Sequence, residues 1–348
     1  MSAIPVIDIG EFLAGGDGSR AAAEIGAAAV TVGFFQVIGH GVDPTLLDAA
    51  YNRMRAVSAL PIAAKDRLMA ANGHPYRGLH LNRDREGVVR QERFLASRFD
   101  DPAAAIAGGV DPQLADYFYP NSWPTEVPAF RTDVGELFTA TQRLAGRIMQ
   151  LFALALELGP DGFDGVIEPN SSGFAINYYP PRNEPLPHDP TVIFDEHSDG
   201  NTLTILHQRG DYEGLQVQRL DAGGTWTPVP VRDDAFVINL GELMTRWTND
   251  HWPATRHRVV ASSNPEAQRT TITTFHMPSL DTVIAPLPQW GGDTDPHYEP
   301  VTTDEWERRF IRRGYTAPSE TTEHHPKVYE FAASLDRGSG ATRDTSTS

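Results

Sequence analysis

The chain has no cysteine among its 348 residues, and this removes several kinds of chemistry. Disulfide bonds, thiolate metal sites, iron–sulfur clusters and cysteine nucleophiles are all excluded. Positive charge is also scarce, because 29 Lys and Arg stand against 46 Asp and Glu and the net charge is −17. Nucleic acids and anionic membranes both require basic surfaces, so we expect no nucleic-acid partner and no membrane partner.

Long apolar runs are missing as well. Residues 1–10 lack the basic start and apolar run of a secretory signal, and the apolar stretch over 21–32 is too short to span a bilayer. We therefore expect a cytoplasmic protein. A hydrophobic content of 40% is typical of a globular protein with a sizeable core. The composition leaves the oligomeric state open and is compatible with a monomer.

Hydrophobic periodicity predicts alternating strands and helices in the first half of the chain. Strands are predicted over 4–9 and 33–38, with a helix over 21–32 between them. A helical region follows to about residue 70, and Asp43 and Pro44 suit its N-cap and first position. The strongest helix is predicted over 131–158, where leucines and other apolar residues recur every three, four or seven positions.

The second half has the texture of a β-sandwich or barrel. Short segments rich in Thr, Val, Ile and aromatics are separated by Gly, Asp, Asn and Pro. The predicted strands are 174–179, 202–208, 215–220, 235–240, 257–261 and 271–276. Thr302 to Glu305 fits a capping box that opens a last helix, predicted to run through Arg313.

A metal site is suggested by His197-Ser198-Asp199 together with His257. Two imidazoles and one carboxylate can occupy one face of an octahedral Fe(II), which leaves three positions for a cosubstrate and O₂. A His-x-acid triplet arises easily by chance, and a second one occurs at 297–299. That triplet follows a Gly- and Asp-rich segment with no third ligand nearby, so we interpret it as a surface loop. We interpret three other histidines as surface or pocket residues: His207, His251 and His276.

An anion site is suggested by Arg269 and Thr271. A guanidinium matches a carboxylate in plane and stays charged when buried. Thr271 lies two residues further, on the same face of the predicted strand, and its hydroxyl can donate a hydrogen bond. The alternative is that Arg269 is a surface arginine on an edge strand.

Several sequence blocks, in a fixed order, resemble one known family. In the first half these are Ile4-Pro5-Val6-Ile7-Asp8, Gly33-Phe34-Phe35, Gly39-His40-Gly41-Val42 and Asn121-Ser122-Trp123-Pro124. In the second half they are Asn177-Tyr178-Tyr179-Pro180-Pro181, His197-Ser198-Asp199, Leu203-Thr204-Ile205-Leu206, Gly214-Leu215-Gln216-Val217, Ile238-Asn239-Leu240-Gly241-Glu242-Leu243, Trp247-Thr248-Asn249 and His257-Arg258-Val259-Val260. Over roughly residues 4–280 the chain resembles the isopenicillin N synthase-like Fe(II)/2-oxoglutarate-dependent dioxygenases.

The resemblance implies a mainly β fold with flanking α-helices. Its core would be a double-stranded β-helix, or jelly roll, with an N-terminal α/β region and outer helices. We accordingly divide the chain into an N-terminal dioxygenase region (1–165), a jelly-roll core for Fe(II) and 2-oxoglutarate (166–282), a C-terminal extension with a helix (283–335) and a disordered tail (336–348).

The resemblance also implies roles for particular residues. His197, Asp199 and His257 map onto the family's iron ligands and are therefore the expected catalytic centre. Arg269 and Thr271, with Asn177 and Tyr179 as weaker candidates, are expected to bind 2-oxoglutarate. Two features depart from the family: Thr271 replaces the serine of its Arg-x-Ser motif, and the connection 262–268 is slightly longer.

The expected activity is hydroxylation, desaturation or ring closure of a small organic molecule, with release of succinate and CO₂. Fe(II), 2-oxoglutarate and O₂ would be required, with ascorbate as a candidate reductant. Because Asp199 is retained, halogenation is not expected. Two alternatives remain: an iron- and O₂-dependent oxidase without 2-oxoglutarate, and a non-catalytic jelly-roll metal-binding protein.

The substrate cannot be read from the sequence, although a role in specialised metabolism is our working expectation. Fold analogy places a few segments near the mouth of such a barrel. These candidate substrate contacts are Tyr76, Arg77, His80, Phe94, His276 and the segment after Met277.

Overall fold

The computed structural model describes residues 4–316, except 72–73, 75, 85, 183, 186–189, 220–221 and 292–293. The predicted disordered tail lies outside the described residues. Within the described part of the chain, no helix combines the length and apolar character needed to cross a membrane.

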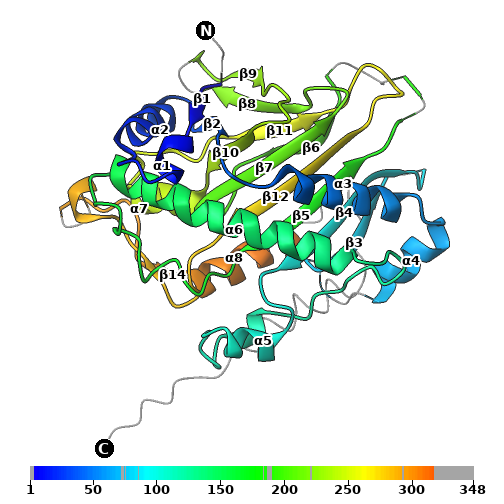
Figure 1. Ribbon diagram of the computed structural model, residues 1–348, viewed down its shortest axis with the longest axis horizontal. Coiled ribbons are helices and arrows are strands. Elements are labelled where there is room, and N and C mark those ends of the chain that lie inside the picture. The colour runs from blue at the N-terminus through cyan, green and yellow to red at the C-terminus, as the bar shows by residue number, and fades with distance from the viewer. Residues whose placement is uncertain are drawn as a thin grey trace, which may run out of the picture.

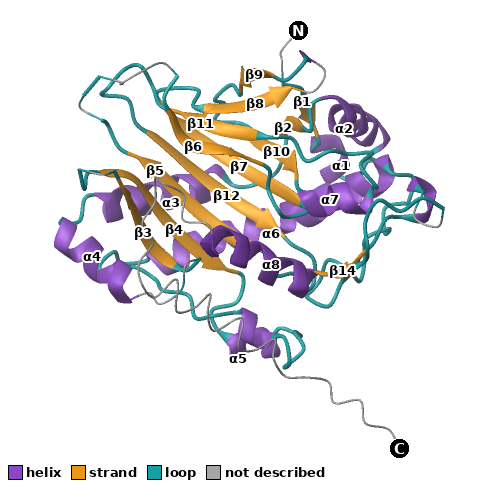
Figure 2. Ribbon diagram, turned by 180° about the vertical axis from the view of Figure 1, so that it is seen from behind, coloured by secondary structure: helices purple, strands orange, loops and turns teal. Residues whose placement is uncertain are grey.

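Two β-sheets form the core (Figure 2). The larger sheet contains, in spatial order, β1 (Val6–Asp8), β2 (Phe34–Ile38), β10 (Phe236–Leu240), β7 (Leu203–Gly210), β12 (Arg269–His276), β5 (Gly173–Tyr179), β4 (Val89–Ser97) and β3 (Gly78–Arg83). The smaller sheet contains β6 (Val192–His197), β11 (His257–Val260), β8 (Leu215–Arg219) and β9 (Thr225–Pro228). β13 (Val283–Ile284) and β14 (Val301–Thr302) pair separately. Neighbouring strands are antiparallel except β1 and β2, which gives the predicted jelly-roll core.

Helices flank this core (Figure 1). They are α1 (Gly10–Leu13), α2 (Ser19–Thr31), α3 (Pro44–Ser58), α4 (Ile62–Ala71), α5 (Pro102–Ala107), α6 (Phe130–Ala155), α7 (Glu242–Trp247) and α8 (Thr303–Thr316), with short 3₁₀ turns at Ala115–Tyr117 and Pro288–Trp290. The longest, α6, crosses the outer face of the larger sheet (Figure 1). Its apolar stripe is buried there, and the Thr141 hydroxyl lies 2.6 Å from that of Thr274 on β12.

Strand alternation separates the two faces of the larger sheet. On β12, Ile272 belongs to the main apolar core and Thr274 contacts α6, so even-numbered side chains point outward. Odd-numbered side chains such as Arg269 and Thr271 point toward the smaller sheet. A second apolar cluster fills part of the space between the sheets, where Phe34 and Val237 meet Val217. The polar inner face beside this cluster is where the site is built.

Most of the predicted elements are confirmed, with shifted boundaries. The Asp43 side chain caps α3 by accepting a hydrogen bond from the Thr45 amide, as predicted. The helical region that follows is two helices, because Pro61 separates α3 from α4. α6 ends at Ala155 rather than at Leu158. Glu157, two residues after this end, has a positive φ, which a continuing helix would not allow. The capping threonine of α8 is Thr302, whose hydroxyl accepts from the Glu305 amide, but the helix continues to Thr316.

Six strands were not predicted: β3, β4, β6, β9 and the two-residue strands β13 and β14. β4 and β6 carry charged side chains, which hide a strand in a hydrophobicity pattern. On β4, however, Glu92 is neutralised by Lys65, whose Nζ lies 2.6 Å from the carboxylate. β6 has exposed positions at the edge of the smaller sheet and therefore needs no apolar alternation.

Candidate active site

The three predicted metal ligands meet on the smaller sheet. His197 is the last residue of β6, and His257 is the first residue of β11, directly opposite it in the antiparallel pairing. Asp199 lies two residues beyond His197, in the turn that leaves β6. One ligand atom from each side chain lies within 4.8 Å of the other two. Both histidine Nε2 atoms are 3.7 Å from the same oxygen, Oδ1 of Asp199.

Both imidazoles are oriented by backbone carbonyl groups. Nδ1 of His197 lies 2.8 Å from the Asp195 oxygen, and Nδ1 of His257 lies 3.2 Å from the Thr255 oxygen. A carbonyl only accepts hydrogen bonds, so each Nδ1 carries the proton and each Nε2 keeps a free lone pair. Two rings held in this way are preorganised as metal ligands.

A close backbone contact fixes the segment before His257. Thr255 donates a hydrogen bond from its hydroxyl to the Val32 carbonyl at 2.8 Å. Gly33 has a φ of +69°, and a Cβ at this position would lie only 2.2 Å from the Thr255 hydroxyl oxygen. A glycine at position 33 therefore allows β2 to approach Thr255, whose carbonyl orients the His257 ring.

Asp199 uses its two oxygens differently. Oδ2 accepts hydrogen bonds from Nδ2 of Asn239, at 2.8 Å, and from the Thr204 hydroxyl. Oδ1 remains directed at the two imidazoles. Burial acts to raise the pKa of Asp199, but the neighbouring histidines and the two hydrogen bonds outweigh it and lower the pKa. The carboxylate is therefore ionised, as a metal ligand must be.

The histidine environment also favours metal binding. Burial lowers the pKa of His197, and the nearby His257 lowers it further, whereas Asp199 acts in the opposite direction. Metal ions bind neutral imidazole, so a lowered pKa reduces the competition from protons. With no thiolate available, an oxygen–nitrogen set of this kind suits Fe(II).

Arg269 is a buried cation on the inner face of β12. Its side chain is almost fully enclosed, with 2% of the residue surface exposed. β12 lies between β7 and β5, so the alternative of a surface arginine on an edge strand is wrong. Its Nη2 donates to Oε1 of Gln208 at 3.0 Å, while its Nε is buried without an acceptor. Among the described residues no carboxylate pairs with it, so the site fits an external carboxylate.

Two of the weaker cosubstrate candidates lie beside this arginine. The Tyr179 ring centre is 5.5 Å from the Arg269 guanidinium carbon, and the phenol oxygen accepts from Nε2 of Gln91 at 2.9 Å. Burial raises the pKa of Tyr179, so the phenol keeps its proton and can also donate a hydrogen bond. Asn177 donates from Nδ2 to the Thr271 hydroxyl oxygen at 3.2 Å. A carboxylate bound at Arg269 would thus lie within a polar, hydroxyl-rich pocket.

Comparison with known proteins identifies the family. The profile of the 2OG-Fe(II) oxygenase superfamily matches residues 170–278, and that of the "non-haem dioxygenase in morphine synthesis N-terminal" family matches 4–126. Gibberellin 20 oxidase 3 from Oryza sativa subsp. japonica is 33% identical over 324 residues, covering 92% of this chain and 84% of the relative. The chain belongs to the 2OG-Fe(II) oxygenase superfamily.

Solved structures agree with this assignment. A Caulobacter crescentus protein described as a 2OG-Fe(II) oxygenase family member is 28% identical, with a TM-score of 0.75 and coverage of 90% of this chain and 99% of its own. JOX2, solved in complex with 2OG, Fe and JA, is also 28% identical, with a TM-score of 0.69 and coverage of 88% and 84%. This oxygenase therefore uses Fe(II) and 2-oxoglutarate and acts on small organic substrates.

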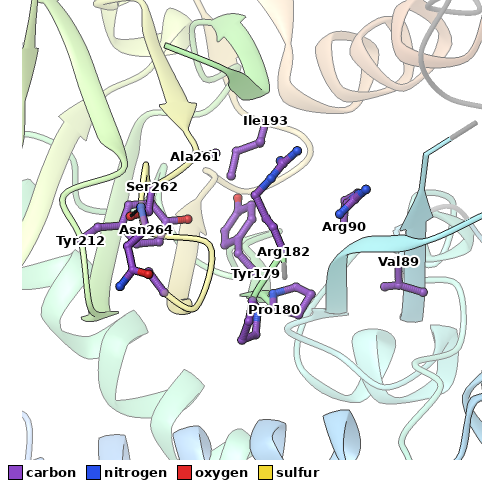
Figure 3. A pocket seen from close by; sticks show the side chains of 12 residues that line it. Val89, Arg90, Tyr179, Pro180, Arg182, Ile193, Tyr212, Ala261, Ser262 and Asn264 are labelled. Carbon is purple, nitrogen blue, oxygen red and sulfur yellow. Dashed lines mark hydrogen bonds between the residues drawn. The ribbon is translucent and has the colours of Figure 1, made fainter. Parts of the chain in front are cut away.

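A small pocket lies beside Tyr179 in the oxygenase (Figure 3). Arg182 and Tyr179 occupy its centre, with Tyr212 on one side and Arg90 on the other (Figure 3). Its volume of about 20 Å³ is enough for a single water molecule, so this pocket cannot hold an organic substrate. Burial raises the pKa of Tyr212 to about 12, although the charge of Arg269 opposes this effect. The pocket therefore adjoins the ring of Tyr179, which in turn lies beside Arg269.

Three of our histidine and aromatic assignments need correction. His207 is neither a surface nor a pocket residue, because it is buried outside the barrel with Nδ1 2.8 Å from the Tyr51 hydroxyl. His276 is likewise buried, and its Nδ1 lies 2.9 Å from the Thr202 hydroxyl. Phe94 is not a substrate contact, since it packs in the main core edge-to-face on Phe130. All three side chains lie on the outer face of the larger sheet, because their strand positions alternate with those that face the smaller sheet.

The remaining histidine predictions agree with the structure. His251 lies at the surface and stacks on Trp290 at a ring-centre distance of 3.8 Å. The second His-x-acid triplet lies in a surface segment outside helices and strands, as predicted. Both His297 and Tyr298 contact the Asp250 carboxylate. Of the candidate substrate contacts, His80 pairs across strands with Arg93 on the inner side of the sheet, whereas Arg77 is buried and donates to backbone carbonyls.

Several supporting residues were not assigned from the sequence. Asn239 and Thr204 donate hydrogen bonds to Asp199. Gln208 contacts Arg269, and Gln91 contacts Tyr179. The fifth of these residues is Arg93 on β4, which donates to Asn177. Asn239 and Thr204 stand within the blocks that carry the family resemblance. Strand alternation from Thr204 to Gln208 places both side chains on the inner face, but their contacts to Asp199 and Arg269 depend on the turn after β6 and on the pairing of β7 with β12.

Proposed function

We propose that His197, Asp199 and His257 hold the Fe(II) of this oxygenase. The preformed Nε2 lone pairs and the free Asp199 Oδ1 support this assignment, because all three point toward one another without another partner. Three protein ligands leave three positions for reactants. Since the carboxylate is present, hydroxylation or another two-electron oxidation is the reaction we propose, rather than halogenation.

We further propose that Arg269 binds the distal carboxylate of 2-oxoglutarate. The observation that carries this proposal is the buried guanidinium with an unsatisfied Nε and no counterion among the described residues. Thr271 and Tyr179 are the hydroxyl groups placed to complete the grip, and Asn177 orients Thr271. When bound, iron and 2-oxoglutarate together supply an oxidant from O₂, with succinate and CO₂ as coproducts.

The residues of the chain then orient the reactants and exclude water. The backbone carbonyls of Asp195 and Thr255 keep the imidazole protons on Nδ1, and Asn239 keeps Asp199 in one orientation. The substrate we propose is a small organic molecule, in keeping with relatives whose names refer to gibberellin and to JA. A net charge of −17 argues against a nucleic acid or an anionic membrane as substrate.

The direct test is reconstitution under argon. The purified chain should develop a weak visible charge-transfer absorption when Fe(II) and 2-oxoglutarate are both added, and neither alone should produce it. The His257→Ala variant should lose this absorption and bind iron much more weakly, while its far-ultraviolet circular dichroism stays unchanged. In air, the wild-type protein should slowly form succinate from 2-oxoglutarate without added substrate.

The same experiment separates the alternatives. Iron binding without any effect of 2-oxoglutarate would point to an oxidase that needs no cosubstrate. Absorption of the chelate without succinate formation would point to a non-catalytic binding protein. Iron bound as tightly by His257→Ala as by wild type would contradict our choice of the distal ligand.

A further inference from the structure

Arg93 lies on the inner face of the larger sheet, in the same row of side chains as the cosubstrate residues. In the pairing of strands it stands opposite Asn177, which in turn stands opposite Thr271. Its Nε donates a hydrogen bond to Oδ1 of Asn177 at 3.0 Å, and Asn177 donates to the Thr271 hydroxyl at 3.2 Å. One amide thus connects the proposed cosubstrate grip to a second cation.

This second cation faces the metal ligands across one aromatic ring. The Arg93 guanidinium carbon is 5.7 Å from the centre of the Phe194 ring. Phe194 in turn packs edge-on against His197, with ring centres 4.7 Å apart. The positive charge is close enough to contribute to the lowered pKa of His197, after burial and His257. Arg93, Phe194 and His197 therefore lie one after another beside the proposed iron site.

Arg93 differs from the neighbouring arginines in having no counterion among the described residues. Arg90 pairs with Asp84 and Glu184, and Arg98 pairs with Glu168. Glu92, the acidic residue next to Arg93, points the other way and binds Lys65. Among the described residues no carboxylate lies within 4.0 Å of the Arg93 guanidinium, and no hydrogen bond of its terminal nitrogens to them is found.

An unneutralised, half-buried guanidinium is unexpected in a chain with 17 excess negative charges. With its Nε held by Asn177, the planar end of the group is fixed in direction and presents two terminal nitrogens. This is the geometry that binds a carboxylate in a bidentate manner. Arg269, on the same face, already accounts for the distal carboxylate of the cosubstrate, so Arg93 is available to a different anion.

We propose that Arg93 binds a carboxylate of the substrate, and that this oxygenase therefore acts on small organic acids. The proposal rests on the function proposed above. The carboxylate would bind the terminal nitrogens of Arg93, and the apolar body of the acid would lie along Phe194 toward the metal ligands. Arg93 is then a specificity-determining residue, and an uncharged analogue of the substrate would lose its main anchor.

The test compares an acid with its amide at the loaded site. Full-length protein under argon, with Fe(II) and 2-oxoglutarate, would be titrated with 4-fluorophenylacetate and with 4-fluorophenylacetamide. Paramagnetic broadening of the ¹⁹F signal reports binding near iron, and without O₂ no turnover occurs. We expect the wild-type protein to bind the acid at least tenfold more tightly than the amide.

Variants assign the preference to one side chain. Arg93→Met keeps an unbranched side chain but removes the charge, and it should abolish the preference, whereas Arg93→Lys should retain part of it. Arg98→Met is the matched control, because this arginine already has a carboxylate partner and should leave the preference unchanged. The affinity for 2-oxoglutarate, followed by the chelate absorption, should change less than twofold in Arg93→Met.

Each of the other outcomes overturns the proposal. A wild-type protein that binds neither probe or binds both equally has no substrate-carboxylate site near iron. An acid preference that survives in Arg93→Met belongs to another residue. A tenfold loss of 2-oxoglutarate affinity in Arg93→Met would instead assign Arg93 to the cosubstrate. Failure of the proposed function is read separately, as the absence of the chelate absorption in the wild-type protein.

Discussion

At the scale of single residues, Arg269 is a buried cation without a carboxylate partner among the described residues. A buried charge is expensive unless it is paired, yet this guanidinium has one amide acceptor and an unsatisfied Nε. The neighbouring Gln208, Tyr179 and Thr271 can position it but cannot neutralise it. We propose that a bound carboxylate offsets the cost of burying this charge.

We therefore expect Arg269→Ala to weaken 2-oxoglutarate binding strongly. Loss of a buried, charge-assisted bidentate contact costs about 2–5 kcal/mol, which corresponds to at least a tenfold rise in the Michaelis constant for 2-oxoglutarate. Iron binding should be unchanged, because Arg269 does not contact the three proposed ligands. Steady-state succinate formation and iron titration measure the two effects.

Arg256→Ala is the matched control for this prediction. Arg256 lies one residue before His257, but its side chain is exposed and pairs with Glu196. An exposed ion pair contributes little, so this variant should keep the wild-type dependence on 2-oxoglutarate. Wild-type kinetics in Arg269→Ala, or a large effect in Arg256→Ala, would show that the cosubstrate anchor lies elsewhere.

Site residues can be predicted from the sequence when the residues that act together are close along the chain. His197 and Asp199 are two residues apart, and Arg269 and Thr271 share a strand face, so both pairs could be found. Arg93 could not be found, because its meaning depends on the pairing of β4 with β5 and on Phe194 in another sheet. His207 was misassigned for a similar reason, since its partner Tyr51 is 156 residues away.

At the scale of elements, the turn after β6 is held by the C-terminal helix. Nε1 of Trp306, on α8, donates to the Gly200 carbonyl at 2.6 Å, and Gly200 directly follows Asp199. The Trp306 ring also lies against Arg246, at 5.3 Å from the guanidinium carbon. A helix far along the chain thus helps to fix the backbone that carries a proposed metal ligand.

Trp306→Phe should loosen this turn without unfolding the protein. Phenylalanine keeps most of the ring contact but cannot donate the hydrogen bond, and the net loss of one such bond is about 1 kcal/mol. We expect iron affinity to fall about fivefold as a result. Trp226→Phe, on β9 under Arg258, provides the control and should bind iron as wild type does. Equal iron affinities in wild type and Trp306→Phe would show that α8 does not support the site.

Elements were predicted best where one face is buried and the other is exposed. α6 shows this periodicity because it covers the larger sheet, and its buried residues match the predicted stripe up to Leu151. β4 and β6 lack it, because β4 buries polar residues on both faces and β6 is an exposed edge. Their assignment depends on neighbours that a linear pattern does not contain.

At the scale of the whole molecule, two buried histidines couple folding to pH. Burial lowers the pKa of His207 and of His276 to about 4, from an ordinary value of 6.5. The unfolded chain therefore binds more protons than the folded protein between these values. Stability is fully present above pH 6.5 and is lost as the pH falls toward 4, by up to roughly 3 kcal/mol for each histidine.

His207→Gln should flatten this pH dependence. A glutamine cannot take up the proton, so the slope of unfolding free energy against pH should fall by up to about 1.4 kcal/mol per pH unit between pH 4 and 6.5. Urea unfolding of the metal-free protein at several pH values measures the slope. A slope equal to that of the wild-type protein would mean that His207 titrates normally in the folded state.

The fold class was predictable as a whole, because many short strands and the ordered family blocks agree. The order of strands was not, since β1 and β2 join the same sheet as β10 through contacts some 200 residues apart in sequence. We propose that the four ranges given from the sequence differ in their functional roles, and that residues 166–282 form the core that binds Fe(II) and 2-oxoglutarate. β4, which carries Arg93, lies outside that core, so the N-terminal region contributes to the proposed substrate site.

Two of the proposed iron ligands, His197 and His257, belong to the smaller sheet, and Asp199 lies in the turn after β6. Arg269 belongs to the larger sheet. Iron and 2-oxoglutarate bound together would therefore fasten one sheet to the other. Ligands that bind only the folded state lower the population of open forms, and open forms are what proteases cleave. We therefore expect proteases to cleave the metal-free protein faster than the protein loaded with Fe(II) and 2-oxoglutarate.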